Sequence, residues 1–516
     1  MAQAGKYKAD LTHGNALASV AIVAVIIAVY LVIYFGSASP KSLNLITTLM
    51  LFNGVLASTG ILSDQRLFSI SKMHWYFQLV FMSMAPFAQY INGYYPSSYL
   101  ISDDYFLAAC LIVLVWNICF LFFYNARSSR KGTKRRRSGK VKNFVLEEKG
   151  LSLSAKRLLA FAAVVSFLLS VALIGFDSMF VKAENTVSLD SSTLSFIVKK
   201  TLSALPAMAC AILILSRKGK SSAYLLIVIA LGMTILVNFP TSTTRYWMGT
   251  IFCGLIFAFV KKETSTRWAD FAICLVLLLV FPLFYIFKYN TLDTAVIDFS
   301  SFLNIADTFC SIDYDAFMLL SRTIQYVDTN GLSFGYQLIN IILFFIPRSV
   351  WPGKPHPSNI VVASSQGSTF TNLSCPIQAE GYINFGVVGV ILFCFIVARF
   401  VKWLDSAYWD SARSRDSLSL LNVCYPFLAV IVIYISRGPL QPSFIQTLAL
   451  ILPAIVIFFL LKREAVEESD VVKTSVKADD KRKAIGTNPQ NGHHGHLSPA
   501  FSPANGRGSG DTRSET

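Results

Sequence analysis

Charged residues are the scarcest class in this chain. Asp, Glu, Lys and Arg together make up 14% of the 516 residues, whereas about a quarter is usual for a soluble domain. That scarcity excludes a soluble globular protein of this length. Hydrophobic residues account for 54% and aromatic residues for 13%, and they come in runs close to the ~20 residues that cross a bilayer. The sequence therefore predicts an all-α polytopic membrane protein.

Motifs for bound cofactors are missing as well. The chain contains no CxxC, HExxH, GxGxxG or Walker pattern, so zinc, nucleotide and redox-cofactor chemistry lack support. His493, His494 and His496 lie close together, but no framework of carboxylates or thiols completes a metal site around them. We therefore expect neither a metal nor a cofactor. No internal repeat is apparent, which argues against a transporter built from duplicated halves.

Cysteine is sparse and suggests little chemistry. Seven of the nine cysteines fall within apolar runs, where thiols are usually small core residues. Cys310 and Cys375 share one long loop. They are bridged if the compartment is oxidising, or they are two unpaired buried thiols.

Twelve apolar runs are candidates for transmembrane helices. The first run lacks a small-residue cleavage site after it, so we expect it to be retained as an anchor. The expected spans form a bundle within residues 1–462 and are 16–35, 42–62, 74–92, 105–124, 157–177, 196–216, 223–238, 247–261, 271–288, 383–401, 417–436 and 445–461.

Basic residues are concentrated in alternate loops. The loop 125–156 carries nine Lys and Arg between positions 127 and 142, and the loops after the sixth, eighth and tenth spans are also basic. The positive-inside rule therefore places both termini in the cytoplasm. The basic run is then expected to touch anionic lipid rather than nucleic acid. Residues 463–516 turn polar and repetitive, which predicts a disordered cytoplasmic tail.

The long loop 289–382 is expected on the outer side of the membrane. Residues 312–322 have helical spacing that places Asp315 and Arg322 on one face. Residues 335–346 are apolar but too short to span, which indicates an interfacial or re-entrant helix. We interpret the loop as a lid of two helices and a proline-clamped turn that lies on the outer surface.

The proline-clamped turn, 345–357, contains four prolines. Because proline fixes the backbone, the turn presents Arg348, Lys354 and His356 from a stiff scaffold. Fixed cations at the outer face of a membrane suit a ligand that carries phosphate.

Two further arginines are expected at the same level. Arg245 begins the eighth span, and Arg437 ends the eleventh. Each is interpretable as a side chain that reaches out to lipid phosphate. Three outer arginines from distant segments, with Arg348, nevertheless favour a shared anionic site, because arginine is costly at membrane depth and is seldom placed there without use.

The motifs around these arginines resemble a known family. Ile-Pro-Arg-Ser-x-Trp-Pro-x-Lys-Pro at 346–355, followed by Glu-x-Tyr-x-Asn-Phe-Gly-type spacing at 380–386, is similar to the Wzy-type polymerases of bacterial surface polysaccharides. Asp315-Ala-Phe, Gly335 before an apolar run, Arg245 and Ser436-Arg437-Gly438 fit the same pattern. The resemblance covers roughly residues 230–440. Members often have Gly-Glu before the tyrosine, whereas here Ala379 precedes the glutamate and Gly381 follows it.

The resemblance implies a fold, a reaction and partners. It implies a membrane glycosyltransferase of the GT-C-like type in the bacterial plasma (inner) membrane, which transfers a growing glycan from undecaprenyl diphosphate to a lipid-linked repeat unit. The expected partners are undecaprenyl-diphosphate-linked oligosaccharide and membrane lipid, together with a chain-length regulator and a flippase of the same pathway. Fixed cations would meet the charge of the leaving diphosphate without a metal.

The residues for this reaction follow from charge and position. The expected diphosphate-binding residues are Arg245, Arg348, Lys354, Arg437 and Arg322. The acceptor hydroxyl must give up its proton as the bond forms, and Glu380 is the first candidate acceptor because it lies at a helix entry beside the arginine motif. His356 and Asp315 are the other candidates. Each acid is equally interpretable as a structural partner of an arginine, with Asp315 orienting Arg322 or Arg348.

Two alternative functions remain open. A flippase for the same lipid-linked oligosaccharide suits twelve spans equally, but it requires charged residues along a path between the two faces. An O-antigen ligase differs only in its acceptor. Because the charges cluster on the outer side beside a long loop, the sequence favours chemistry over passage.

Overall fold

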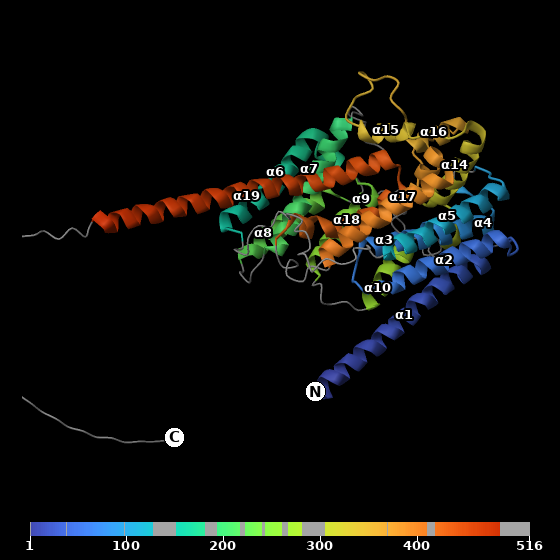
Figure 1. Cartoon of the computed structure of the whole chain (residues 1–516), viewed down its shortest axis with the longest axis horizontal. Coiled ribbons are helices and arrows are strands. Elements are labelled where there is room, and N and C mark those ends of the chain that lie inside the picture. Colours follow the sequence, from blue (N-terminus) through green and yellow to red (C-terminus); the bar gives the residue numbers. More distant parts are fainter. Residues whose placement is uncertain are drawn as a thin grey trace, which may run out of the picture. The chain divides into compact units, whose positions relative to one another are not determined.

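The computed structural model describes residues 2–37, 39–96, 99–126, 151–180, 193–216, 222–239, 243–260, 267–280, 305–368, 370–409 and 418–485. The chain divides into two compact units, Met1–Leu461 and Lys462–Thr516. Helices are the only extended regular elements in the described ranges, which confirms the all-α prediction (Figure 1).

The helices follow one another in this order: α1 (Ala2–Gly36), α2 (Leu45–Ser63), α3 (Ile70–Leu79), η1 (Val80–Met84), α4 (Ala85–Asn92), α5 (Asp103–Asn125), α6 (Leu153–Ile174), η3 (Asp177–Met179), α7 (Thr193–Leu215), α8 (Ser222–Val237), α9 (Arg245–Phe259), α10 (Arg267–Leu275), η4 (Val276–Val280), α13 (Ile305–Phe309), η5 (Ile312–Tyr314), α14 (Ala316–Asn330), α15 (Tyr336–Ile342), α16 (Ser358–Ser365), α17 (Ile377–Trp409), α18 (Leu420–Arg437) and α19 (Leu440–Ile485).

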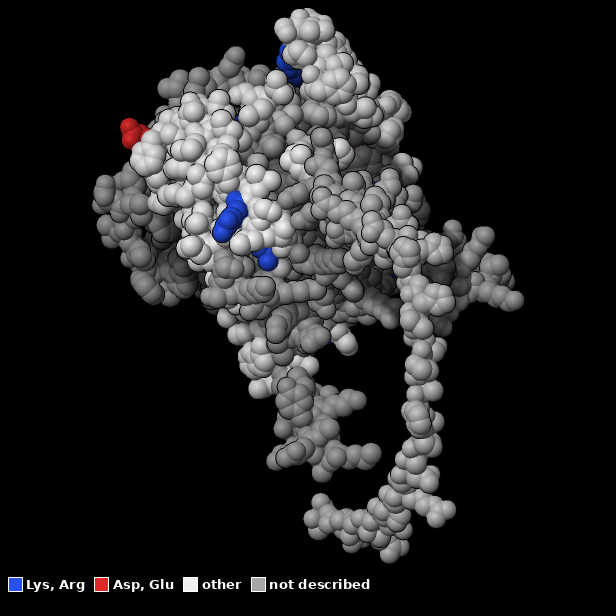
Figure 2. All heavy atoms as spheres, turned by 90° about the vertical axis from the view of Figure 1, so that its left-hand side faces the viewer, with Lys and Arg blue, Asp and Glu red and all other residues white. Residues whose placement is uncertain are grey.

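Eight helices of the described residues are long and apolar enough to cross a membrane, which is the architecture of a polytopic membrane protein. They are Asn15–Gly36, Leu45–Ser63, Asp103–Asn125, Leu153–Ile174, Thr193–Leu215, Ile377–Trp409, Leu420–Arg437 and Leu440–Lys462. On the face drawn in Figure 2, charged side chains of the described residues are few and scattered.

The other four expected spans differ from single long helices. The runs 223–238 and 247–261 form the shorter apolar helices α8 and α9. The run 74–92 is divided into α3, the π-helical turn η1 and α4, because η1 changes the hydrogen-bonding register within it. The run 271–288 begins as α10 and η4, and its end from 281 onwards lies outside the described residues.

Two apolar cores organise the first unit, and α18 belongs to both. The first core joins α1 to α5 with α14 and α17, and the second joins α6 to α9 with α19. Tyr425 and Ala429 of α18 pack in the first core, whereas Phe427 and Ile431 pack in the second. Because α18 is apolar on opposite faces, its C-terminal residue Arg437 lies where the two cores meet.

Helix α17 is broken near its start. Phe385 and Gly386 leave helical geometry, and Gly386 has a φ of 61°, which favours glycine. A side chain at Gly389 would collide with the backbone oxygen of Gly381, so the segments on either side of the break pack closely. The expected span at 383–401 is thus preceded by a short helical segment that carries Glu380.

The segment expected to lie as a lid on the surface is partly inside the bundle. Helix α14 buries its first nine residues, and Phe317 packs its ring 5.1 Å from that of Phe106 on α5. The run Phe317-Met-Leu-Leu320 is apolar enough to pack inside the bundle, which explains why α14 is buried and does not lie on the surface. Helices α15 and α16 lie together at the upper edge of Figure 1, and Gly335 begins α15 with a φ of 86°.

The tail also differs from the expected disorder. Helix α19 continues to Ile485 and therefore includes residues 463–485. These residues are rich in Glu, Lys, Arg and Ala, which have high helix propensity and can form a helix without burying a core. The rest of the expected tail, 486–516, and the basic loop residues 127–150 lie outside the described residues.

The loops gather at two opposite ends of the bundle, as the alternation of basic loops predicted. Residues 64–72, 124–126, 267–270 and 405–409 meet at one end, which we call the Asp405 end. Residues 312–315, 374–380 and 437–440 meet at the other, which we call the Arg437 end.

Candidate functional site

Arg437 is the centre of a buried ionic layer at the Arg437 end. Its Nη2 lies 3.0 Å from Oδ1 of Asp315, and its Nε donates to the carbonyl of Asp313 at 3.1 Å. Its guanidinium carbon is 4.9 Å from the centre of the Tyr246 ring. Among the described residues no hydrogen bond engages its second terminal nitrogen, Nη1, which leaves that N–H edge available to a ligand.

Arg245 joins the same layer from α9. Its guanidinium forms an ion pair with the Asp313 carboxylate, and both side chains are largely buried. The structure thus brings together Arg245 and Arg437, which the sequence predicted to share an anionic site. It also adds Asp313, which the sequence analysis did not select although it stands only two residues from Asp315.

Asp315 is a structural partner rather than a free base in this arrangement. Besides Arg437, it accepts hydrogen bonds from the backbone N–H and the hydroxyl of Ser374. The sequence suggested that Asp315 orients Arg322 or Arg348, but the partner within ion-pair distance is Arg437. A carboxylate engaged in this way holds its arginine in place.

Glu380 has a different environment. It is 2% exposed, its Oε2 accepts from the Ser358 hydroxyl at 2.7 Å, and its Oε1 accepts from the backbone N–H of Leu440 at 3.0 Å. Among the described residues no cation lies within ion-pair distance of its carboxylate. Unlike Asp315, Glu380 is therefore not engaged by a cation.

The proline-clamped turn is held by its own cations. Arg348 donates to the carbonyls of Lys354 at 2.6 Å and Pro355 at 3.0 Å, and it lies 3.2 Å from Nδ1 of His356. Lys354 donates to the carbonyls of Phe344 and Ile346, both at 2.9 Å. Arg348 is therefore placed within the turn, and no contact joins it to Arg437 or Arg245 among the described residues.

A groove of about 600 Å³ opens beside this turn. Tyr326, Tyr336, Lys354 and His356 line it. Burial and the nearby Arg348 hold the pKa of Lys354 below its ordinary value, and the same two causes lower the pKa of His356. The His356 imidazole is thus neutral near pH 7. Because Arg348 donates to its Nδ1, the ring proton lies on Nε2, which can donate a hydrogen bond in the groove.

Arg322 occupies a separate position on α14. It is 2% exposed, its Nε donates to Gln366 at 2.6 Å, and its guanidinium lies 4.3 Å from the centre of the Tyr99 ring. Its Nη2 is buried without a hydrogen-bond partner. The sequence placed it among the diphosphate-binding residues, but these contacts connect it to Gln366 and Tyr99 rather than to the layer around Arg437.

Three supporting residues escaped the sequence analysis: Asp313, Ser358 and Ser374. Each contacts a predicted site residue across a long stretch of sequence, and serine at such positions carries no recognisable motif. Cys310 and Cys375 are both free and buried, so the unpaired alternative holds. In the part of the chain that the structure describes, no group of three or more His, Cys, Asp or Glu residues could hold a metal ion.

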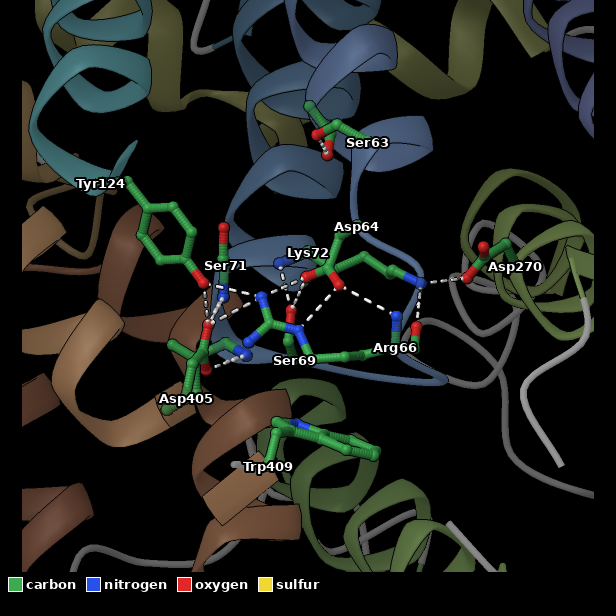
Figure 3. Close-up of polar contacts among 12 residues, drawn as sticks. Ser63, Asp64, Arg66, Ser69, Ser71, Lys72, Tyr124, Asp270, Asp405 and Trp409 are labelled. Atoms are coloured by element: carbon green, nitrogen blue, oxygen red, sulfur yellow. Dashed lines mark hydrogen bonds and ion pairs between the residues drawn. The ribbon is translucent and has the colours of Figure 1, made fainter. Parts of the chain in front are cut away.

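A second buried ionic cluster lies at the Asp405 end (Figure 3). Arg66 forms a two-pronged contact with Asp64 at 2.8 and 2.7 Å and donates to Tyr124 at 2.7 Å. Lys72, which is fully buried, pairs with Asp270 at 2.6 Å. The cluster therefore joins the α2–α3 connection to α5 and α10.

Asp405 connects that cluster to α17. Its carboxylate accepts from the backbone N–H groups of Ile70 and Ser71 at 3.1 and 3.3 Å, so it caps the start of α3. It also accepts from the hydroxyls of Tyr124 at 2.9 Å and Tyr425 at 2.6 Å. Helices α3, α5, α17 and α18 are thus fixed around one side chain that is fully buried.

We expect Asp405→Ala to destabilise the fold by about 3–5 kcal/mol. It leaves two backbone N–H groups and two tyrosine hydroxyls without their buried acceptor, and it removes one of the two carboxylates that face Arg66. Thermal unfolding in detergent, followed with a thiol-reactive dye on the buried cysteines, measures the loss. Asp104→Ala removes an exposed carboxylate from the other end of α5 and should leave the transition unchanged. An unshifted transition in Asp405→Ala would show that the cluster does not hold the helices together.

Comparison with protein-family models, with curated proteins and with solved structures finds no match to this chain.

Proposed function

We propose that the protein polymerises undecaprenyl-diphosphate-linked oligosaccharide repeat units into a surface polysaccharide. The observation that carries the proposal is the pairing of two features at the Arg437 end. A layer of largely buried, ion-paired arginines leaves Nη1 of Arg437 open. Glu380, without a cation partner, is held between Ser358 and Leu440, the latter three residues from Arg437. Electrostatic stabilisation and proton acceptance are the two tasks that glycosyl transfer sets.

The proposed step balances in bonds and protons. The acceptor hydroxyl oxygen bonds to the anomeric carbon of the donor glycan, and the bond from that carbon to the diphosphate oxygen breaks. Glu380 takes the hydroxyl proton, while Arg437 and Arg245 stabilise the negative charge on the departing lipid diphosphate. The acceptor sugars are proposed to bind in the groove lined by Lys354 and His356. His356 is two residues before Ser358, which donates to Glu380.

The distribution of buried charge supports chemistry over passage. Eight charged residues are buried in the described chain: Lys72, Asp270, Asp313, Asp315, Arg322, Lys354, Glu380 and Asp405. Three belong to the cluster at the Asp405 end, and the others belong to α17, η5, α14 and the loop at the Arg437 end. A flippase requires such groups along the path between the ends, so this arrangement favours the glycosyltransferase.

The proposed localisation is the bacterial plasma membrane, with the Asp405 end and both termini in the cytoplasm. In this orientation the Arg437 end, with the groove and Glu380, faces outward. The reaction then takes place on the outer side, where the lipid-linked repeat units would be delivered by a flippase and the product length set by a regulator.

Cysteine labelling should reveal this orientation. We expect Ser365→Cys, exposed near the end of α16, to react with a membrane-impermeant maleimide in intact cells. Ser138→Cys in the basic loop should react only after lysis. The native cysteines are buried or half-buried, so the parent chain serves as the background control. Reaction of Ser138→Cys in intact cells would reverse the assignment of the two ends.

Deletion of the gene tests the proposed function directly. We expect single repeat units capped on the carrier, with loss of the long-chain ladder on a gel of surface glycan. Long chains that remain unattached would indicate a ligase, and absence of repeat units outside the membrane would indicate a flippase. Restoration by the full-length gene is the control.

A further inference from the structure

The ionic layer at the Arg437 end carries no net charge by itself. Arg245 is paired with Asp313 and Arg437 with Asp315, so two positive charges face two negative charges. A lipid diphosphate brings at least two further negative charges. Strong binding of such a group calls for a cation whose charge is not already cancelled by a carboxylate.

Lys200 is such a cation. It is half-buried in the first turns of α7, and its Nζ lies 4.6 Å from the centre of the Trp247 ring and 5.9 Å from that of Phe196. Among the described residues no carboxylate lies within ion-pair distance of it. The aromatic faces stabilise the ammonium group without neutralising it.

Its position relates it to the two arginines. Trp247 stands two residues after Arg245 in the first turn of α9, and it is fixed by a hydrogen bond of 3.0 Å to Asn238. Tyr246, between them, faces the Arg437 guanidinium. The first turn of α9 therefore carries Arg245 and contacts two other cations. Lys200 lies against it from α7, and Arg437 lies against it from α18.

We propose that Lys200 is a further binding residue for the diphosphate of a polyprenyl-linked substrate, approached from the α7 side. The inference rests on the proposed function, since that function supplies the ligand. The phosphate of an ordinary membrane lipid has the same chemistry, and the experiment separates the two sources. Lys199, the adjacent lysine, has no contact with Trp247 and provides a matched control.

Trp247 offers a direct readout. The full-length protein, in nanodiscs of neutral lipid, is titrated with farnesyl diphosphate while tryptophan fluorescence is followed. We expect a saturable change, because diphosphate binding draws the ammonium group away from the indole. The change should be lost in Trp247→Phe, which identifies the reporter among the seven tryptophans.

The variants decide the role of Lys200. We expect Lys200→Met to weaken farnesyl diphosphate binding at least tenfold, Lys200→Arg to weaken it less, and Lys199→Met to change it less than twofold. Affinity of Lys200→Met equal to that of the parent would overturn the inference. A response of equal size to farnesol, which has no phosphate, would also overturn the inference. A response of equal size to nanodiscs that contain phosphatidylglycerol would overturn it as well and would make Lys200 a lipid anchor.

Two further results keep this inference separate from the proposed function. Unfolding temperatures of the variants show whether each is folded. Lys200-dependent binding in a protein whose gene deletion leaves the polysaccharide unchanged would remove the polymerase function but keep the site. Loss of the polysaccharide on gene deletion, together with binding that does not depend on Lys200, would keep the function and remove Lys200 from the site.

Discussion

Arg437→Ala is expected to abolish chain extension while the protein stays in the membrane. The guanidinium is held by the carbonyl of Asp313 and the carboxylate of Asp315, with Nη1 left open. Removal of one preorganised donor to a developing negative charge typically costs about 100- to 1000-fold in rate. Single repeat units should therefore replace the polymer ladder in a deletion strain that carries this variant.

The controls separate charge, geometry and folding. Arg437→Lys should restore activity only in part, because a point charge cannot reproduce the planar fork that reaches the diphosphate. Arg157→Ala removes an exposed arginine on α6 and should leave the ladder intact. A full-length ladder in Arg437→Ala would show that the residue only anchors the protein to lipid phosphate.

Glu380→Gln is expected to eliminate polymerisation at every pH but to preserve binding of the lipid diphosphate. The amide retains the shape of the side chain and an acceptor for the Leu440 N–H, but it cannot take up the hydroxyl proton. Loss of a general base typically costs about 100- to 10,000-fold. Turnover of the purified variant and its affinity for farnesyl diphosphate measure the two effects separately.

The outcome also distinguishes Glu380 from His356. A histidine base works when it is neutral, so its activity is lost as the pH falls through its pKa, which burial and Arg348 place below the ordinary value of ~6.5. Retained turnover in Glu380→Gln that falls at acid pH, together with loss of turnover at every pH in His356→Gln, would assign the proton to His356. Asp328→Asn alters an exposed carboxylate on α14 and should behave as the parent.

The membrane helices could be predicted from the sequence because apolar length is a local property. The interruption of the third run had a local signal that the sequence analysis did not use. Pro86 has no N–H for the carbonyl of Met82, four residues earlier within η1, and its ring crowds that carbonyl. The burial of α14 was also missed. Its polar flanks suggested a surface helix, whereas Phe317 and its neighbours fill the space beside α5 and α17.

The sequence predicted which residues belong to the site better than it predicted which of them contact one another. Arg437 and Arg245 were identified because cations are unusual at outer helix ends. Their partners were not, because Arg437 and Asp315 are 122 residues apart and the contact depends on how α18 meets the Ile312–Asp315 turn. Arg348 was expected beside them, but the carbonyl groups of its own turn lie closer and satisfy its donors.

The cap that Asp405 places on α3 has a consequence for the synthesis of the protein. Asp405 follows Ile70, the first residue of α3, by 335 positions. Asp270, the ion-pair partner of Lys72, follows that lysine by 198 positions. A chain that emerges N-terminus first therefore makes α3 long before either acid exists. Until α10 is made, Lys72 lacks its carboxylate, and until α17 is inserted, the first N–H groups of α3 lack their acceptor. Both features mark the nascent chain as unfinished. We expect a membrane protease or an insertion chaperone to recognise chains that stop before residue 405 by this helix.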